Sequence, residues 1–201
     1  MLLDPEESQL VLVDYQQRLM PTIAEREAVL ANAVRLVRIA QLLQVPAWGT
    51  EHNPAGLGPL DPALQPLLGQ VLPKMSFSAA EVLLPRLRPP VREPQGGNAR
   101  SLPKHLRKPV EPTAEPRGSL VLAGCEAHVC LLQTALALLD EEFDVWVVTD
   151  ACSSRTERNR DAAFDRLAGA GCELVTTEMV AFEWLGSAEH PRFKDVLALL
   201  K

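Results

Sequence analysis

Apolar runs alternate with amphipathic segments along most of this chain. Runs that predict buried strands cover residues 9–13, 46–50, 120–123, 144–149 and 173–176, with a weaker one at 71–76. Apolar residues at helical spacing predict helices at residues 25–44, 79–87, 131–139 and 157–170, and helical segments at 180–185 and 192–200. Because strands and helices alternate and the strands are almost continuously apolar, we expect an α/β fold with a parallel sheet covered by helices on both faces.

Polar residues and one glycine stand where the predicted strands end. Asp14 follows the first strand, Thr50 ends the second and Lys74 lies in the third, while Gly124 and Asp150 follow later strands. Open parallel sheets bind ligands beyond the carboxyl ends of their strands, where the strand order reverses. We therefore expect these five residues to face one crevice.

The stretch from 89 to 117 departs from this pattern. It holds seven of the 17 prolines, a Gly-Gly-Asn sequence and His105, and it has little apolar periodicity. Such a composition is typical of a long surface loop or a disordered insertion, and a lid or a partner contact is the alternative interpretation. The 201 residues are enough for one substantial core, so we expect residues 1–201 to form a single domain with this insertion.

Charge and cysteine usage narrow the class of protein. The net charge is −6 and the pI is about 5.3. This excludes the basic footprint that nucleic-acid binding requires. The sequence has no apolar stretch of membrane-spanning length and no signal-peptide pattern at its start, so we predict no membrane association and a cytoplasmic location. The four cysteines have neither the spacing of a disulfide framework nor that of a zinc site.

Cys130 is the first candidate for chemistry. It comes shortly after the strand at 120–123 and its terminal Gly124, so we expect it in the first turn of the following helix. Free N–H groups and the helix dipole at that position favour a thiolate, which makes a cysteine nucleophilic near neutral pH. The alternative is that Cys130 packs as a small buried hydrophobic residue.

Asp14 and Lys74 could supply an acid and a base beside this thiol. Each has a simpler explanation alone, since Asp14 could cap a turn and Lys74 could be solvated. Their shared position at the carboxyl edge of one sheet favours a common site with Cys130. The sequence shows no G-x-G-x-x-G after the first strand, which argues against a nucleotide-binding enzyme.

Five motifs follow one another along the chain outside the 89–117 insertion. They are Asp14-x-Gln16, Thr50-Glu51 with Pro54-x-Gly56-Leu57-Gly58-Pro59, Lys74-Met75-Ser76-Phe77-Ser78-Ala79, Gly124-x-Glu126-Ala127-His128-Val129-Cys130-x-x-Gln133-Thr134-Ala135 and Asp150-Ala151-Cys152-Ser153-Ser154-Arg155. Together they resemble the isochorismatase-like cysteine hydrolases, and the similarity runs from about residue 10 to the C-terminus. It is nearest to the isochorismatase domain-containing subgroup, which is related to nicotinamidases and N-carbamoylsarcosine amidohydrolases.

The resemblance implies a fold, a catalytic triad and an assembly. The expected fold is a three-layer α/β/α sandwich with a six-stranded parallel sheet, and the expected assembly is a homo-oligomer. In the implied triad Asp14 is the general base, Lys74 holds Asp14 and Cys130 in register, and Cys130 attacks a carbonyl to give a thioester that water hydrolyses.

The resemblance also implies how the reacting oxygen is held. The oxyanion hole would be formed by the backbone N–H groups of Glu126 and Cys130, beside a cis peptide bond between Cys125 and Glu126. The residues expected around the substrate pocket are Gln16, Thr50, His52 and Phe77.

The region after the second strand departs from the metal-binding members of the superfamily. Nicotinamidases bind a metal through an Asp-x-His motif and a second histidine, whereas residues 50–54 hold one histidine, His52. Glu51 and His52 offer too few ligands. We therefore predict no metal and no cofactor.

Two functions remain after this comparison. The first is a metal-independent cysteine hydrolase that cleaves a C–N bond of a small amide-type molecule through a Cys130 thioester. The alternative is a catalytically weak protein of the same fold that serves in binding or interaction. The intact Asp14, Lys74 and Cys130 favour the hydrolase, and the 89–117 insertion favours the alternative.

Overall fold

The structure is a computed structural model and describes residues 2–89 and 117–201. Nearly all of the predicted insertion at 89–117, including His105, lies outside the described residues. The expectation of a surface loop there therefore stays a prediction.

Six parallel strands form one sheet across the described residues. The order in space is β3-β2-β1-β4-β5-β6, so β1 and β4 are the central neighbours from which the chain extends in both directions. This reversal of strand order creates the switch point at which α/β proteins hold ligands. The strands are β1 (Ser8–Val13), β2 (Ala47–His52), β3 (Val71–Lys74), β4 (Ser119–Gly124), β5 (Asp144–Val148) and β6 (Glu173–Val175).

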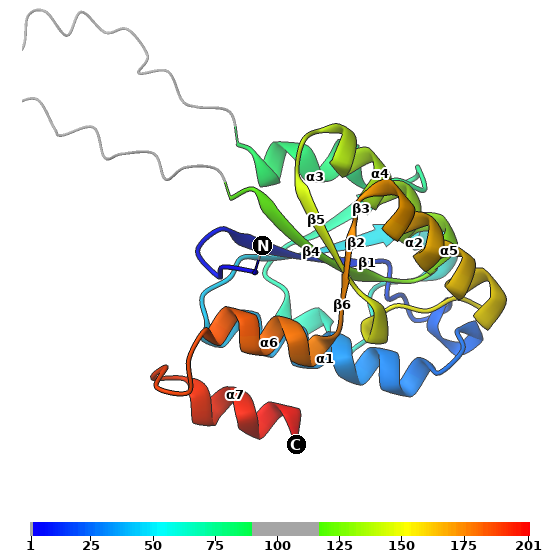
Figure 1. Ribbon diagram of the computed structural model, residues 1–201. Coiled ribbons are helices and arrows are strands. Elements are labelled where there is room, and N and C mark those ends of the chain that lie inside the picture. Colours follow the sequence, from blue (N-terminus) through cyan, green and yellow to red (C-terminus); the bar gives the residue numbers. More distant parts are fainter. Residues whose placement is uncertain (1, 90–116) are drawn as a thin grey trace, which may run out of the picture.

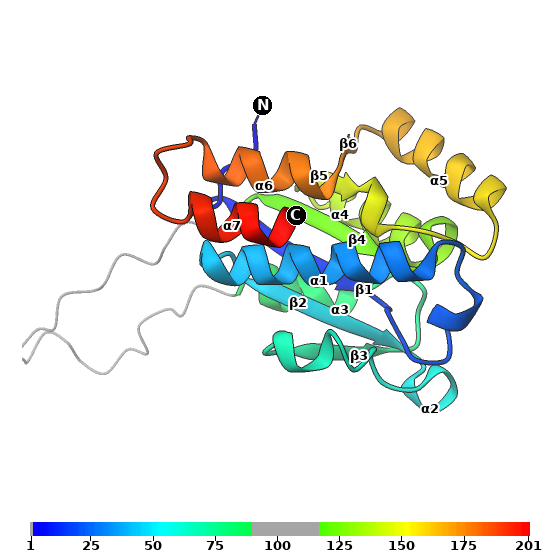
Figure 2. The ribbon, with the colours of Figure 1, turned by 90° about the horizontal axis from the view of Figure 1, so that it is seen from below.

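Helices cover both faces of the sheet and confirm the expected three-layer α/β/α sandwich (Figures 1 and 2). One layer contains α1 (Arg26–Leu42), α6 (Thr177–Leu185) and α7 (Phe193–Leu200). The opposite layer contains α3 (Ala80–Leu87), α4 (Leu132–Asp140) and α5 (Glu157–Ala170). The short helix α2 (Pro54–Leu57) lies in the connection from β2 to β3.

The core follows from the apolar pattern of the two central strands. Every residue of β1 is buried, as are the residues of β4 after Ser119. Both faces of these strands are covered by helices, which explains their continuous apolar sequence. The matching stripe on α1 consists of Val29, Ala33, Leu36, Val37, Ile39 and Ala40.

The strand ends nearest the predicted site differ from the sequence prediction. β2 continues to His52 instead of ending at Thr50, because His52 still pairs with Lys74 of β3. β3 ends at Lys74 instead of Ser76, because the chain turns back so that the Ser76 and Phe77 carbonyls accept hydrogen bonds from the Lys74 ammonium. The predicted loop after β2 contains α2, which starts at Pro54, a residue whose fixed φ suits the first turn of a helix.

Gly124 is required where β4 meets β1. A Cβ at this position would lie 2.7 Å from both the Cβ and the carbonyl oxygen of Val13. We expect Gly124→Ala to lower the free energy of unfolding by about 1–3 kcal/mol, because the central strands must separate to admit the methyl group. Urea denaturation measures this change.

Gly169 provides the matched control. It lies inside α5 with nothing within 4 Å of its ideal Cβ. Gly169→Ala should stabilise the protein by roughly 0.4–1 kcal/mol, since alanine restricts the unfolded chain and favours the helix. Equal effects of the two substitutions would contradict the close approach at Gly124.

Candidate functional site

Asp14 is positioned by the turn that ends β1. Its φ is 58°, a left-handed conformation that Asp adopts more readily than most residues. Its N–H donates to the Thr50 carbonyl at 3.2 Å, and its own carbonyl accepts the Gln16 N–H at 2.8 Å. The side chain is completely buried at the carboxyl end of the sheet.

Lys74 forms a buried ion pair with Asp14. The Lys74 Nζ lies 2.6 Å from Asp14 Oδ2, and both side chains have no exposed surface. The other two ammonium protons are used by the carbonyls of Ser76 at 3.2 Å and Phe77 at 3.0 Å. Asp14 Oδ1 accepts a hydrogen bond from Thr50 Oγ1 at 2.7 Å. Each charge is thus compensated by a counter-ion and further hydrogen bonds, as a buried pair requires.

Cys130 lies beside this pair. The residue belongs to one turn of π-helix, Ala127–Leu131, that leads into α4, and it is 6% exposed. Thr134 Oγ1 donates to the Cys130 carbonyl at 2.6 Å and accepts the Ala79 N–H at 2.9 Å, which ties this turn to the start of α3. The side chains of Asp14 and Lys74 both act on the thiol through charge and hydrogen bonding.

The surroundings of Cys130 oppose the thiolate that its position at the start of a helix favours. Burial, followed by the negative charge of Asp14, raises the pKa of the Cys130 thiol from its usual 9.0 to about 12. Lys74 lowers this pKa and offsets only part of the increase. The sulfur is therefore protonated at neutral pH, and a nearby base must take its proton during any attack.

The raised pKa predicts how the reactivity of Cys130 depends on pH. Alkylation by iodoacetamide requires the thiolate, so its rate at Cys130 should still rise about tenfold per pH unit between pH 8 and pH 10. N-acetylcysteine, as the control, should approach its plateau in the same range. Peptide mapping by mass spectrometry separates Cys130 from the other three cysteines. A Cys130 rate that levels off near pH 7 would contradict the prediction.

The backbone before Cys130 is arranged around a cis peptide bond. The structure has this bond between Cys125 and Glu126. The Glu126 carbonyl accepts the N–H groups of Val129 at 3.1 Å and Leu131 at 3.3 Å, so Glu126 begins the turn that carries the thiol.

Gln16 and Thr50 are held inside the site by hydrogen bonds, and the expectation that they lie around the substrate pocket stays a prediction. Each side chain is fully buried. Gln16 Nε2 donates to the carbonyls of Gly58 at 2.6 Å and His52 at 3.0 Å, and its Oε1 accepts the His52 N–H at 2.8 Å. These bonds use the amide that a ligand would need, so Gln16 fixes the end of β2 while Thr50 orients Asp14.

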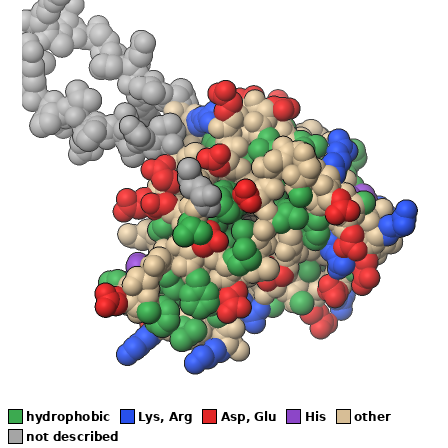
Figure 3. All heavy atoms as spheres, viewed as in Figure 1, with side chains coloured by type: hydrophobic (Ala, Val, Ile, Leu, Met, Phe, Trp, Pro, Cys, Tyr) green, Lys and Arg blue, Asp and Glu red, His purple; other side chains and the backbone are tan. Residues whose placement is uncertain are grey.

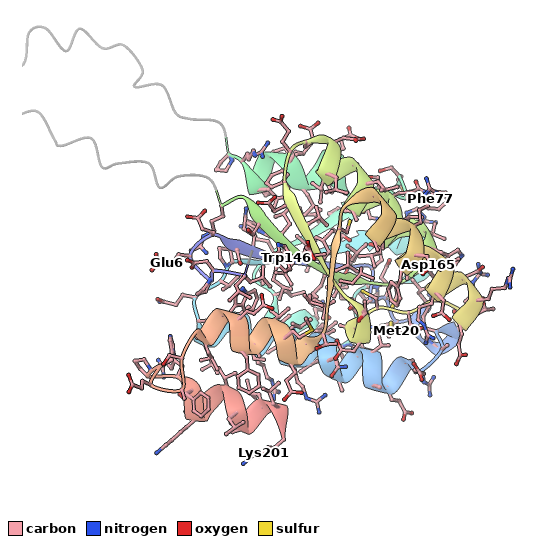
Figure 4. All side chains as sticks on the ribbon, viewed as in Figure 1. Glu6, Met20, Phe77, Trp146, Asp165 and Lys201 are labelled. Carbon is pink, nitrogen blue, oxygen red and sulfur yellow. The ribbon has the colours of Figure 1, made fainter. Side chains whose placement is uncertain are left out.

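His52 and Phe77 lie together at the surface beside the buried pair. Their ring centroids are 5.2 Å apart, and Phe77 is 51% exposed. Figure 4 places Phe77 and Glu6 at opposite ends of the molecule, with Phe77 beyond the carboxyl ends of the strands. Because the Phe77 carbonyl is bound by Lys74, this aromatic pair is connected directly to the ion pair.

The segment that follows β5 was only partly anticipated from the sequence. Asp150 does not join the crevice, because its Oδ1 accepts the N–H and the hydroxyl of Thr177 at the start of α6. Arg155 binds the Glu126 carboxylate at 2.9 Å. The motif at 150–155 marked this segment in the sequence, but it does not reveal that Arg155 contacts Glu126.

Within residues 2–89 and 117–201, no cluster of three or more His, Cys, Asp and Glu side chains could hold a metal ion. None of the described helices combines the length and apolar character needed to cross a bilayer.

Comparison with known proteins agrees with this architecture. Residues 8–179 match the isochorismatase domain. The human isochorismatase domain-containing protein 2 is 35% identical over 199 residues, which cover 98% of this chain and 84% of that protein. The rat protein of the same name is 35% identical over 197 residues, covering 98% and 82% respectively.

Solved structures show the same fold. A Caenorhabditis elegans structure named MAR1 ribonuclease has a TM-score of 0.83 and 29% identity, and the match covers all of this chain and 92% of that one. YcaC from Escherichia coli, described as an octameric hydrolase of unknown specificity, has a TM-score of 0.78 and 25% identity, with coverage of 100% and 87%. With the domain match and the 35% identical relatives, these findings establish that the chain belongs to the isochorismatase family and has its hydrolase fold.

Proposed function

We propose that this protein is a cysteine hydrolase that cleaves the C–N bond of a small amide-type substrate. The observation that carries the proposal is the position of the Cys130 thiol beside the buried Asp14–Lys74 pair. A nucleophile, a base and a fixed positive charge are the groups that covalent amide hydrolysis needs. The proposed reaction requires no metal and no cofactor.

The first half of the reaction forms a thioester. Asp14 takes the thiol proton while the sulfur attacks the carbonyl carbon, and the carbonyl electron pair moves to oxygen. The backbone N–H groups of Glu126 and Cys130 stabilise that oxyanion. The C–N bond then breaks as Asp14 gives the proton to the departing nitrogen, which leaves as ammonia or an amine.

The second half releases the acid. Asp14 takes a proton from water as the water attacks the thioester carbonyl. The C–S bond then breaks, and the departing sulfur takes that proton back from Asp14. Lys74 transfers no proton in this scheme, because Asp14 and two carbonyls hold its three protons. Its role is to position Asp14 and to compensate the negative charge in the site.

A screen of small amides, ureas and carbamoyl compounds for ammonia release tests this proposal. A hit should give a Cys130 acyl adduct after an acid quench, visible by intact-mass and peptide mass spectrometry. Asp14→Asn should release no ammonia above background and form no adduct. Ammonia release that continues unchanged in Asp14→Asn would contradict the mechanism.

The ribonuclease name belongs to the C. elegans relative, and we infer a small-molecule substrate for this chain. Its net charge of −6 opposes the approach of a polyanion, whose binding depends on neutralising phosphates. RNA cleavage that persists through purification and is lost in Asp14→Asn would overturn this inference.

We also propose that the chain forms homo-oligomers in solution. Hydrophobic side chains gather over α6 and α7 in the lower part of Figure 3. Met179 is 45% exposed and Phe182 41% exposed on α6, and the Phe182 ring lies 6.5 Å from that of Phe193 on α7. The octameric description of YcaC supports an assembly. Light scattering that gives the monomer mass of 22.0 kDa would contradict it.

A further inference from the structure

Residues 153–155 bind three consecutive residues of the turn that precedes Cys130. The Ser153 carbonyl accepts the Ala127 N–H at 2.8 Å. Ser154 Oγ lies 2.9 Å from His128 Nδ1. Arg155 binds Glu126. The 153–155 segment thus holds residues 126–128 from outside the sheet, although it follows β5 and they follow β4.

Of these three contacts, the one between Arg155 and Glu126 joins two oppositely charged side chains. Both the backbone N–H and the Nε of Arg155 donate to Glu126 Oε2, at 3.0 Å and 2.9 Å. The Glu126 side chain is only 10% exposed, whereas that of Arg155 is 61% exposed. Two donors on one carboxylate oxygen restrict the side chain of Glu126 and, through it, the orientation of its peptide group.

The restricted orientation of this peptide group affects how the oxyanion is stabilised, because the Glu126 N–H is one of the two proposed hydrogen-bond donors to it. A donor misplaced by a fraction of an ångström stabilises a transition state less, even where substrate binding is unchanged. The Glu126 carboxylate also lies on the same residue whose N–H must stabilise the negative oxyanion. The Arg155 guanidinium compensates the charge of this carboxylate, so that it repels the oxyanion less.

We propose that Arg155 is a positioning residue for the oxyanion hole, which it acts on through the Glu126 carboxylate. This inference rests on the proposed function. Its consequence is specific: Arg155 affects steps in which an oxygen at the reacting carbon becomes negative, and it does not affect the nucleophilicity of the Cys130 sulfur.

Two probes of Cys130 separate these effects without a known substrate. Acetaldehyde labelled with 13C at the carbonyl forms a reversible thiohemiacetal with a thiol, and its oxygen occupies the position of the oxyanion. Iodoacetamide transfers a carbamoylmethyl group to the sulfur, which loses its proton as iodide leaves, and no oxyanion forms. The variants are Arg155→Ala, Arg155→Lys and the control Arg158→Ala, which removes another exposed arginine from the same region.

We expect Arg155→Ala to raise the dissociation constant of the acetaldehyde adduct about tenfold, less than the roughly 10²–10³ loss seen when an oxyanion donor is removed. Arg155→Lys should recover most of this loss because it restores a charged donor. Arg158→Ala should match the wild type. The rate of Cys130 alkylation by iodoacetamide should be the same in all four proteins.

Three results would count against the inference. Equal acetaldehyde affinities in Arg155→Ala and the wild type would overturn it while leaving the proposed function intact. An alkylation rate that falls in parallel with the acetaldehyde affinity would show that Arg155 acts on the thiol, which also overturns it. A wild-type protein that is alkylated at Cys130 and forms no acetaldehyde adduct would overturn the proposed function together with the inference.

Discussion

Replacement of Cys130 by alanine is expected to lower the hydrolysis of any amide substrate by roughly 10⁴- to 10⁶-fold, the range seen when a covalent nucleophile is removed. Without the sulfur no acyl-enzyme can form, and the Asp14–Lys74 pair can at most orient a water molecule. The substitution deletes one buried atom, so the protein should still fold. Ammonia release under single-turnover and steady-state conditions gives the ratio of rates.

Cys172→Ala is the matched control for this experiment. Cys172 is also buried, with a pKa raised by burial to about 11, but it precedes β6 and so lies at the amino edge of the sheet. Its removal should leave turnover within about twofold of the wild type, as expected for a site distant from the reaction. Full activity in Cys130→Ala would exclude the covalent mechanism.

Lys74→Met should be the most destabilising substitution at the site. It leaves the Asp14 carboxylate buried without its counter-ion, and breaking a buried pair in this way costs about 3–5 kcal/mol. It also releases the Ser76 and Phe77 carbonyls from their anchor. Urea denaturation at pH 7 measures the loss of stability.

A double-mutant cycle shows whether the pair itself is responsible. Asp14→Asn with Lys74→Met removes both charges, so the double variant should be more stable than the sum of the two single losses predicts. Lys194→Met, which changes an exposed lysine on α7, should shift the free energy of unfolding by less than about 0.5 kcal/mol. Strict additivity of Asp14→Asn and Lys74→Met would contradict the coupling.

The sheet was predictable because each of its strands carries its own apolar run. Helices bury both faces of the parallel sheet, so strands such as β1 and β5 show no alternation of apolar and polar residues. Their continuous apolar runs therefore predict them directly. The errors lie at the ends of strands. β3 ends where Lys74 turns the chain back on itself, an effect of a side chain that no periodicity records.

The sequence predicted which residues meet at the ends of the strands better than it predicted what each of them does. The sheet topology brings Asp14, Thr50 and Lys74 together, as expected from their positions. A helix dipole favours a thiolate, but burial and the adjacent carboxylate outweigh it at Cys130. The contact between Arg155 and Glu126 joins two segments that are distant in sequence, so the neighbours of Arg155 in the sequence do not reveal it.

The three protons of Lys74 link the orientation of Asp14 to the shape of the surface at Phe77. One proton orients the proposed base, and the other two hold the backbone that presents Phe77 beside His52. Sequence changes at 75–78 would alter both this surface and the hydrogen bonding of the Asp14–Lys74 pair. In the proposed hydrolase, whose substrate pocket we expect to include His52 and Phe77, selectivity and reactivity would therefore be inherited together, and a new specificity should arise more readily from loops that Lys74 does not touch.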